Sequence, residues 1–292
     1  MYLIAGSTGL VGGEICRLLK EGGKPVRALV RATSDQDKKN NLKECGAELV
    51  QGDLRDRASL DAACQGVTAV ISTASAMPFS YQPGENDIQT VDTEGQMNLI
   101  DAAKAAGVEH FVYTSFTADN DFPLRNAKRK VEKHLKASGL TYTIMRAGYF
   151  MEVWLSPAVG FDVENTKAQI YGSGENPVSW ISFLDVARFA VQCLENPAAI
   201  NATFDVGGPE ALTPLETVKI FERIGGKSFE VQFVAEDALA QQQQDATDPM
   251  QQSFTGLMRW IAHGDPIDMA PALEAVPIEL TSVKQYAQRV LV

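Results

Sequence analysis

Short apolar runs alternate along the first half of the chain with stretches in which apolar residues recur every three or four positions. The short runs predict buried strands over residues 2–5, 25–31, 47–51, 67–73, 109–115 and 141–146. The periodic stretches predict helices over residues 10–21, 34–45, 56–64, 87–106 and 124–138. Because the strands alternate with helices, the pattern predicts a doubly wound α/β fold, a parallel sheet with helices on both faces.

The pattern changes after residue 147, where glycine and proline become frequent. Helices are predicted over residues 183–195 and 213–224, and strands over 203–206 and 229–234. We therefore expect a Rossmann core at residues 1–150 and a small C-terminal α+β lobe at residues 151–292. The two parts are expected to interleave and to form one structural unit.

A glycine-rich loop joins the first predicted strand to the first predicted helix. It consists of Gly6, Ser7, Thr8, Gly9, Leu10, Val11 and Gly12. In such a loop the first glycine permits a sharp turn, the second lets the backbone approach a pyrophosphate, and the third lets the helix pack on the strand. The helix N–H groups and dipole then meet the phosphate charge. The loop predicts a dinucleotide site, and the alternative is an ordinary strand–helix turn.

Arg31 follows the second predicted strand, about 20 residues after the glycine loop. A carboxylate at this place would bond the ribose 2′-hydroxyl of NAD, whereas an arginine pairs with the 2′-phosphate of NADP. Arg31 therefore predicts NADP(H) in preference to NAD(H). The alternative is a solvated arginine, with Asp35 or Asp37 reaching the ribose.

Small and polar residues end the third and fourth predicted strands. Asp53 and Leu54 follow the third strand, where a carboxylate can accept a hydrogen bond from an adenine amino group. A turn-forming aspartate is the alternative. Thr73, Ala74 and Ser75 end the fourth strand, and their small size lets a cofactor cross the sheet edge.

Composition narrows the function classes. The 292 residues carry a formal charge of −11, which disfavours nucleic acid and anionic membrane surfaces as partners. Four cysteines lie far apart and are expected to be buried and reduced, and three isolated histidines predict no metal site. No signal peptide and no apolar run of bilayer length is visible, so we expect a cytoplasmic protein.

Several segments resemble atypical short-chain dehydrogenase/reductases. They are residues 6–12, 52–54, 107–115 and 139–146, and the resemblance covers about residues 1–225. The branch that they resemble most is the NmrA-like NAD(P)H-binding family, with quinone-reductase-like and isoflavone-reductase-like relatives. The resemblance implies a Rossmann core with a small substrate lobe. It also implies that the glycine loop, Arg31, Asp53, residues 73–75 and Lys128 contact the dinucleotide.

The catalytic residues that the resemblance implies are only partly present. A Tyr-x-x-x-Lys pair usually drives catalysis in this superfamily, and Lys128 matches the lysine while Leu124 replaces the tyrosine. Related extended members have Asn-x-x-Gly on the preceding helix, where this chain has Asp92–Gly95. Lys128, Ser115 and Tyr149 are the candidate catalytic residues. Their alternatives are a basic helix face, a turn cap and a core tyrosine, respectively.

We expect an oxidoreductase that transfers a hydride from NADPH to a small apolar quinone, enone or carbonyl compound. A quinone can take its proton from solvent, so the missing tyrosine matters less there than for a ketone. The apolar residues expected in the lobe suit a flat substrate; they are Phe150, Met151, Trp154, Phe161 and Trp180. The alternatives are a non-catalytic NADP(H) sensor acting through a protein partner, or a scaffold with a vestigial fold.

Overall fold

The computed structural model describes residues 1–78 and 80–291, which divide into two compact units. The first unit comprises Met1–Ser115, Asn126–Met145 and Val186–Phe204. The second comprises Phe116–Arg125, Arg146–Asp185 and Asp205–Val292. The chain thus passes between the units more than once.

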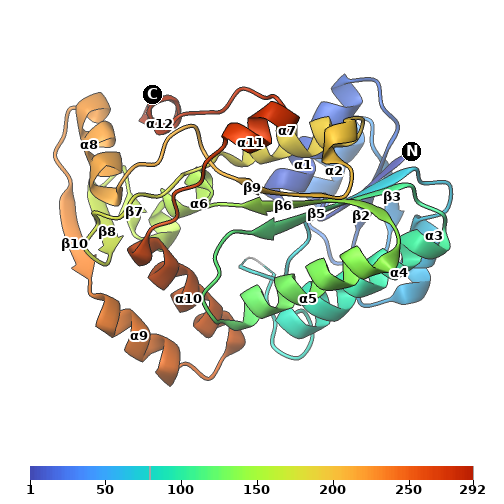
Figure 1. The fold of residues 1–292 in the computed structure, drawn as a ribbon, viewed down its shortest axis with the longest axis horizontal. Coiled ribbons are helices and arrows are strands. Elements are labelled where there is room, and N and C mark those ends of the chain that lie inside the picture. Colours follow the sequence, from blue (N-terminus) through green and yellow to red (C-terminus); the bar gives the residue numbers. More distant parts are fainter. Residues whose placement is uncertain (79, 292) are drawn as a thin grey trace. The chain divides into compact units, whose positions relative to one another are not determined.

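The first unit is built on a seven-stranded sheet with the order β3-β2-β1-β4-β5-β6-β9 (Figure 1). Its strands are β1 (Tyr2–Ala5), β2 (Val26–Val30), β3 (Glu48–Gln51), β4 (Ala69–Ser72), β5 (His110–Phe116), β6 (Thr141–Ala147) and β9 (Ala202–Val206). The pairs β1–β2, β1–β4, β2–β3 and β4–β5 are parallel. The order reverses at β1, as in doubly wound dinucleotide folds. The predicted fold class is confirmed.

Helices cover both faces of this sheet (Figure 1). One face carries α1 (Leu10–Glu21), α2 (Gln36–Glu44) and α7 (Phe183–Cys193). The other carries α3 (Arg57–Ala63), α4 (Gln96–Ala105) and α5 (Pro123–Ser138). A short 3-10 turn, η3 (Pro197–Ala199), precedes β9. Each helix buries its apolar stripe against the sheet, which is why the strands read as nearly continuous apolar runs.

One predicted helix cap and one predicted helix type were wrong. The cap of α2 is Asp35 and not Ser34, because the Asp35 side chain accepts a hydrogen bond from the Lys38 amide. The single helix expected over residues 87–106 begins instead as the π-helix η1 (Ile88–Gly95) and continues as α4. Its capping box at Asp87 was not predicted. The wider turn was missed because apolar spacing does not separate a π-turn from an α-turn.

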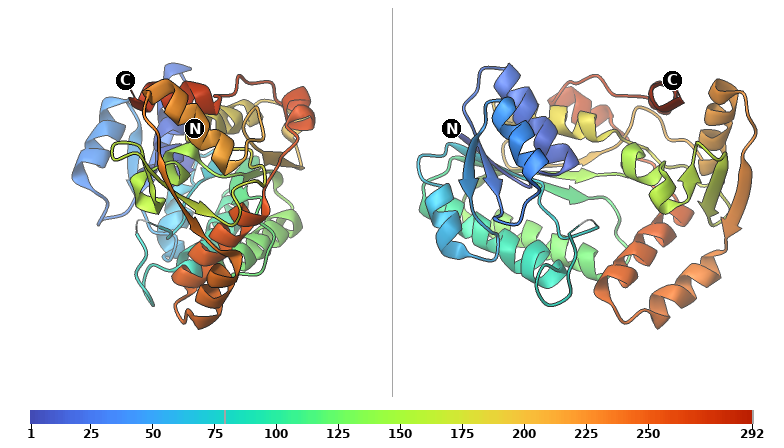
Figure 2. Two further views of the ribbon diagram at one scale, coloured as in Figure 1. Left: turned by 90° about the vertical axis from the view of Figure 1, so that its left-hand side faces the viewer. Right: turned by 180° about the vertical axis from the view of Figure 1, so that it is seen from behind.

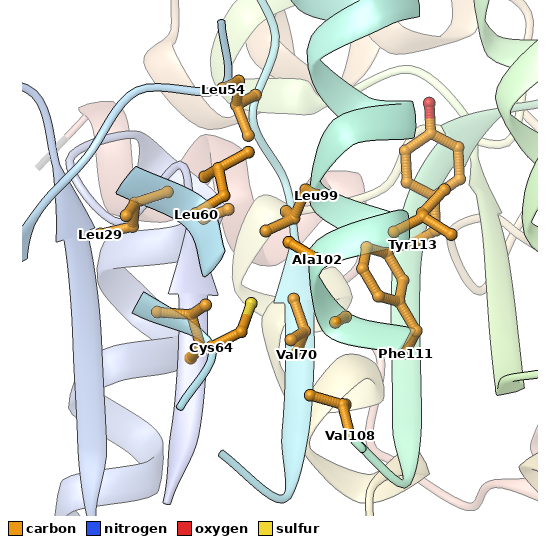
Figure 3. Close-up of a cluster of buried hydrophobic side chains, with 14 of the residues drawn as sticks. Leu29, Leu54, Leu60, Cys64, Val70, Leu99, Ala102, Val108, Phe111 and Tyr113 are labelled. Atoms are coloured by element: carbon orange, nitrogen blue, oxygen red, sulfur yellow. The ribbon is translucent and has the colours of Figure 1, made fainter. Parts of the chain in front are cut away.

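The core of the first unit lies between the sheet and the helices α3, α4 and α5. Figure 3 shows Val70, Leu99, Phe111 and Tyr113 from three of these elements packed together. Phe111 and Tyr113 are completely buried. The Tyr113 ring points toward the carboxyl end of β5, so its hydroxyl lies at the edge of the cluster (Figure 3).

The second unit holds a three-stranded sheet and most of the C-terminal helices (Figure 2). Its sheet has the order β10-β8-β7, with β7 (Phe161–Asp162), β8 (Lys167–Tyr171) and β10 (Glu230–Val234). Its helical segments are α6 (Met151–Trp154), η2 (Pro157–Val159), α8 (Pro214–Gly225), α9 (Glu236–Asp245), α10 (Pro249–His263), α11 (Ala270–Ala275) and α12 (Val283–Leu291). The first two strands were not predicted, because they are short and separated by a polar turn.

Replacing Phe111 with alanine should lower the free energy of unfolding by about 3–5 kcal/mol, because the truncation leaves a cavity in a closed core. Phe233→Ala is the control, since that ring is 57% exposed. Urea unfolding curves of the two variants measure the difference. Equal destabilisation by both variants would contradict the assigned core.

Candidate functional site

The predicted cofactor residues of the first unit follow the carboxyl ends of adjacent strands. In the sheet register Ala5 of β1 pairs with Ser72 of β4, and Val30 of β2 pairs with Gln51 of β3. The glycine loop and Thr73 therefore lie next to each other, as do Arg31 and Gly52. Ligands of open α/β sheets bind beyond the carboxyl ends of the strands, next to the strand where the order reverses. We call these strand ends, together with the residues that follow them, the cofactor edge of the sheet.

The glycine loop makes a sharp turn between β1 and α1. Gly6 adopts a φ of +82°, which other residues rarely adopt, and its carbonyl accepts a hydrogen bond from the Gly9 amide at 2.9 Å. Gly9 caps α1 without a side chain, so no side chain covers the amides at the start of the helix. The Ser7 hydroxyl donates to the Leu29 carbonyl at 2.8 Å and ties the loop to β2.

Close packing explains the other glycines of the loop. A Cβ on Gly12 would lie 2.3 Å from the Gly6 carbonyl oxygen and 2.9 Å from Thr73 Oγ1. A Cβ on Gly6 would lie 2.7 Å from the Ala74 amide nitrogen. The loop, the first turn of α1 and the segment after β4 therefore approach one another as backbone. The remaining loop side chains differ in exposure: Val11 is buried and Leu10 is 47% exposed.

Two arginines and two polar side chains line the ends of β2 and β3. Arg31 donates to Asn86 Oδ1 at 2.7 Å, and Asn86 is itself buried. Arg55 forms a two-pronged ion pair with Asp53, at 2.9 and 2.7 Å. The hydrogen bonds from Arg55 lower the pKa of Asp53, and Arg31 contributes to the same direction.

Arg55 and Asn86 were not singled out in the sequence. Arg55 lies two residues after Asp53, a spacing that is compatible with a local ion pair, whereas nothing in the sequence connects Asn86 with Arg31. Because Arg55 offsets the charge of Asp53, these two residues and Arg31 together carry one positive charge. Leu54 packs against Gly95 of η1, where an added Cβ would lie 2.8 Å from the Leu54 Cβ.

The segment after β4 lies at the middle of the edge. The Thr73 hydroxyl donates to the Ala5 carbonyl at 3.2 Å, and Thr73, Ala74 and Ser75 are each partly exposed. Ala76 is buried, and its amide donates to the Asp92 carboxylate at 3.0 Å. Residues 73–75 are thus held as a narrow, partly open strip.

Lys128 is buried, with only 5% of its surface exposed. Its ammonium lies 3.5 Å from Asp92 Oδ1, 3.5 Å from the Thr114 carbonyl oxygen and 5.2 Å from the centre of the Tyr113 ring. Asp92 is completely buried, which raises the pKa of its carboxyl, while the Lys128 charge acts in the opposite direction. The sequence predicted no role for Asp92 and Tyr113. Asp92 lies on η1 and Tyr113 on β5, and only the fold brings both of them to Lys128.

Ser115 is already engaged by two neighbours. Its hydroxyl donates to Glu132 Oε1 at 2.6 Å and accepts from Arg129 at 3.2 Å. Arg129 and Glu132 also pair with each other at 2.6 Å. The Ser115 side chain is buried within this cluster.

Tyr149 belongs to the second unit, where its hydroxyl donates to the Leu257 carbonyl at 2.9 Å. Burial raises the pKa of Tyr149 well above its usual value, so its proton is hard to remove. Leu124, at the position of the missing tyrosine, is also buried in this unit. Of the three candidate catalytic groups, Lys128 has the least satisfied hydrogen-bonding capacity.

A small pocket lies within the second unit, with a volume of about 20 Å³, which is room for about one water molecule. Trp154, Phe161 and Trp180, three of the five apolar residues expected to suit a flat substrate, contribute to its wall. Thr217 also lines it, and neither Trp180 Nε1 nor Thr217 Oγ1 has a hydrogen-bond partner among residues 1–78 and 80–291. The pocket is thus largely apolar, and its two unpaired polar atoms are buried.

Other ligand classes receive less support from the described residues. No group of three or more His, Cys, Asp or Glu side chains in that part of the chain is arranged to hold a metal ion. No described helix has the length and apolar character needed to cross a bilayer. The four cysteines are free, and burial raises the pKa of Cys16 and Cys193 to about 12 and that of Cys64 to about 11.

Comparison with known proteins relates this site to a family. The model of the NmrA-like family matches residues 2–287. An NAD(P)H azoreductase from Xenophilus azovorans is 33% identical over 283 residues, which are 95% of this chain and 92% of that protein. The photosystem II assembly factor Ycf39 from Trieres chinensis is 34% identical over 234 residues, which are 78% of this chain and 70% of that protein.

A solved structure has the same fold over nearly the whole length. The NADPH-dependent quinone oxidoreductase QOR2 of Escherichia coli, solved with NADPH, superposes with a TM-score of 0.76 and is 23% identical. The superposition covers 99% of each chain. The glycine-loop cradle fits a dinucleotide for reasons internal to this chain: uncapped helix amides, backbone that a Cβ would obstruct, and cationic side chains at β2 and β3.

Gly12→Ala should weaken NADPH uptake by at least about tenfold, because the new methyl group displaces the Gly6 carbonyl and with it the phosphate-binding loop. Gly13→Ala is the matched control, since its Cβ would meet only the Ser7 carbonyl, at 3.4 Å. Isothermal titration of both variants gives the comparison. Unchanged affinity in Gly12→Ala would show that the loop does not hold the cofactor.

Proposed function

Because the chain belongs to the NmrA-like family, we propose that it is an NADPH-dependent reductase of small apolar quinones, enones or carbonyl compounds. The observation that carries the proposal is the buried Lys128 ammonium beside the cofactor edge of the sheet. Azoreductase is the name of a relative that matches almost the full chain, and quinone oxidoreductase that of a structural neighbour. Both names support reduction by a nicotinamide cofactor as the general reaction.

Cofactor binding follows from the geometry of the edge. The amides at the start of α1 are available to the diphosphate, and Gly6 and Gly12 keep that approach free of side chains. Arg31 is suited to the 2′-phosphate of NADP, for which it would exchange its hydrogen bond to Asn86. Asp53 and Leu54 border the adenosine side, and residues 73–75 pass beneath the cofactor as a narrow strip.

The proposed role of Lys128 is to hold the nicotinamide ribose and to stabilise negative charge on the substrate. When bound, the cofactor supplies the hydride, so the chain has to position the reactants and exclude water. An ammonium with long contacts of 3.5 Å retains donors for a ribose hydroxyl or a substrate oxygen. Ser115 and Tyr149, also proposed as catalytic, would first have to release Glu132 and Leu257.

The proposed substrate class rests on the second unit. Its apolar cluster contains Phe161 and Trp180 and packs against Trp154, and aromatic side chains of this kind line sites for flat apolar molecules. A quinone is a flat molecule of this kind and accepts its proton from solvent. It therefore does not require the tyrosine that Leu124 replaces.

A second candidate function is that of an assembly or sensing protein that binds NADP(H) without turnover. Two observations favour it: Leu124 stands in place of the usual proton donor, and several relatives are named as photosystem II assembly factors. The two functions are separated by NADPH consumption against a panel of quinones, enones and azo dyes. Tight NADPH binding with no consumption across the panel would favour the second function.

Lys128→Met should lower kcat by about 100-fold or more, because it removes a charged donor from the reacting groups. Lys130→Met is the matched control on the same helix, since Lys130 is exposed. Steady-state NADPH oxidation at saturating quinone measures both. If Lys128→Met turns over at the wild-type rate, Lys128 is not catalytic.

Arg31→Asp should shift the ratio of kcat/KM for NADPH to that for NADH by about 100-fold toward NADH, because the aspartate repels the 2′-phosphate and accepts from a 2′-hydroxyl. Lys104→Asp makes the same charge change at an exposed position of α4. A matching shift in the Lys104 variant would indicate a general field effect and would refute the specific role of Arg31.

A further inference from the structure

One buried carboxylate of the first unit has no role in the reaction proposed above. Asp92 lies on the π-helix η1 and is completely inaccessible to solvent. Its Oδ2 accepts the Ala76 amide at 3.0 Å, and its Oδ1 faces the Lys128 ammonium at 3.5 Å. It therefore contacts both Ala76, which directly follows Ser75, and the proposed catalytic lysine.

The charge of Asp92 is not needed for the local backbone. An uncharged asparagine of the same shape would accept the Ala76 hydrogen bond equally well, whereas burying a carboxylate is unfavourable without a cationic partner. The charge of Lys128 lowers the pKa of Asp92, against the effect of burial. Since Asp92 Oδ1 accepts no other hydrogen bond in the described part of the chain, its function is tied to the ammonium.

The ammonium depends on Asp92 in turn. The other neighbours of Lys128 are the Thr114 carbonyl, at 3.5 Å, and the face of Tyr113. Neither carries a formal charge, and Lys128 is 5% exposed, so Asp92 supplies the counter-charge that keeps an ammonium at this depth. The Arg129–Glu132 ion pair of the same unit is shorter, with 2.6 Å between nitrogen and oxygen. The longer Asp92–Lys128 contact orients the ammonium without occupying all its donors.

The π-helix fixes the direction of Asp92. A turn that contains an extra residue rotates the following side chains relative to an α-helix, and such turns occur often at functional sites. Gly95 ends η1 with its backbone against Leu54, where a Cβ would lie 2.8 Å from the Leu54 Cβ. Both ends of the wide turn are thereby fixed, at the Asp87 capping box and at Gly95.

We propose that Asp92 is a positioning residue that holds the Lys128 ammonium at the cofactor edge and couples it to the Thr73–Ser75 strip. The proposal rests on the proposed function in that Lys128 contacts the cofactor. Asp92 itself touches neither cofactor nor substrate. Movement of the strip on cofactor binding is transmitted through the Ala76 amide to Asp92, and from there to the ammonium.

The test is a double-mutant cycle in NADPH affinity with Asp92→Asn, Lys128→Met and the combined variant, measured by isothermal titration. Each single change should raise Kd by about tenfold, and the combined variant should bind no more weakly than Lys128→Met alone. Asp101→Asn is the control, because it removes a carboxylate that pairs with His134 at the surface of the same helix layer. It should leave Kd unchanged.

A second readout needs no cofactor. In protein labelled with ¹⁵N at lysine Nζ, the Lys128 signal is the one that Lys128→Met removes. It should be sharp in the wild type and broadened or shifted in Asp92→Asn, while Asp101→Asn leaves it in place. The same signal should respond little to changes at exposed lysines.

The outcomes separate the two proposals. Additive Kd effects in the cycle, or a Lys128 signal that is indifferent to Asp92→Asn, would overturn the positioning role even if NADPH binds and is consumed. A Lys128 signal that depends on Asp92 in a protein that takes up no NADPH would support the anchoring of the ammonium and reject the proposed function. Coupled affinities together with a displaced signal support both.

Discussion

The close approach of three backbone segments is the constraint on which the cofactor edge depends. The loop after β1, the first turn of α1 and the segment after β4 meet where Gly6 and Gly12 have no side chains, and a single methyl group at Gly12 would lie 2.3 Å from a carbonyl oxygen. Close-packed backbone cannot yield locally, so the loop keeps one shape. That shape leaves the amides at the start of α1 without a side-chain cap, and it fixes the position of residues 73–75 at the middle of the edge.

Buried charge is the second organising feature. Lys128, Asp92, Glu132 and the hydroxyl of Tyr113 lie within one layer of the first unit, between the carboxyl end of β5 and the helices η1 and α5. Desolvation makes buried charges costly, so each of the three charged groups lies beside a group of opposite charge. The Tyr113 hydroxyl is uncharged and has no hydrogen-bond partner among the described residues. The closed pair Arg129–Glu132 holds the Ser115 hydroxyl, while the longer contact of Lys128 with Asp92 leaves donor capacity. The need to pair buried charges thus explains why Ser115 is fully hydrogen-bonded while Lys128 retains donors for a ligand.

Family membership and fold leave the reaction open, because the relatives include proteins named as reductases and proteins named as assembly factors. The difference must lie in side chains and not in the sheet. The proposed reaction rests on three such features of this chain: the buried Lys128, the leucine at position 124 and the aromatic side chains of the second unit.

The order of elements, the glycine loop and the residues that follow β1 to β4 could be read from the sequence, because alternating strands and helices bring all carboxyl strand ends to one edge. The resemblance to short-chain dehydrogenase/reductases also pointed to Lys128 and to Leu124 in place of the usual tyrosine. Only the tertiary structure brought Asp92 against Lys128 and Asn86 against Arg31. The partners are 36 and 55 residues apart in the chain, and nothing in the sequence connects them. The sequence also did not predict the π-turn that directs Asp92, or the short strands β7 and β8. The periodicity of apolar residues shows which face of an element is buried, whereas contacts between elements decide which partner a polar side chain meets.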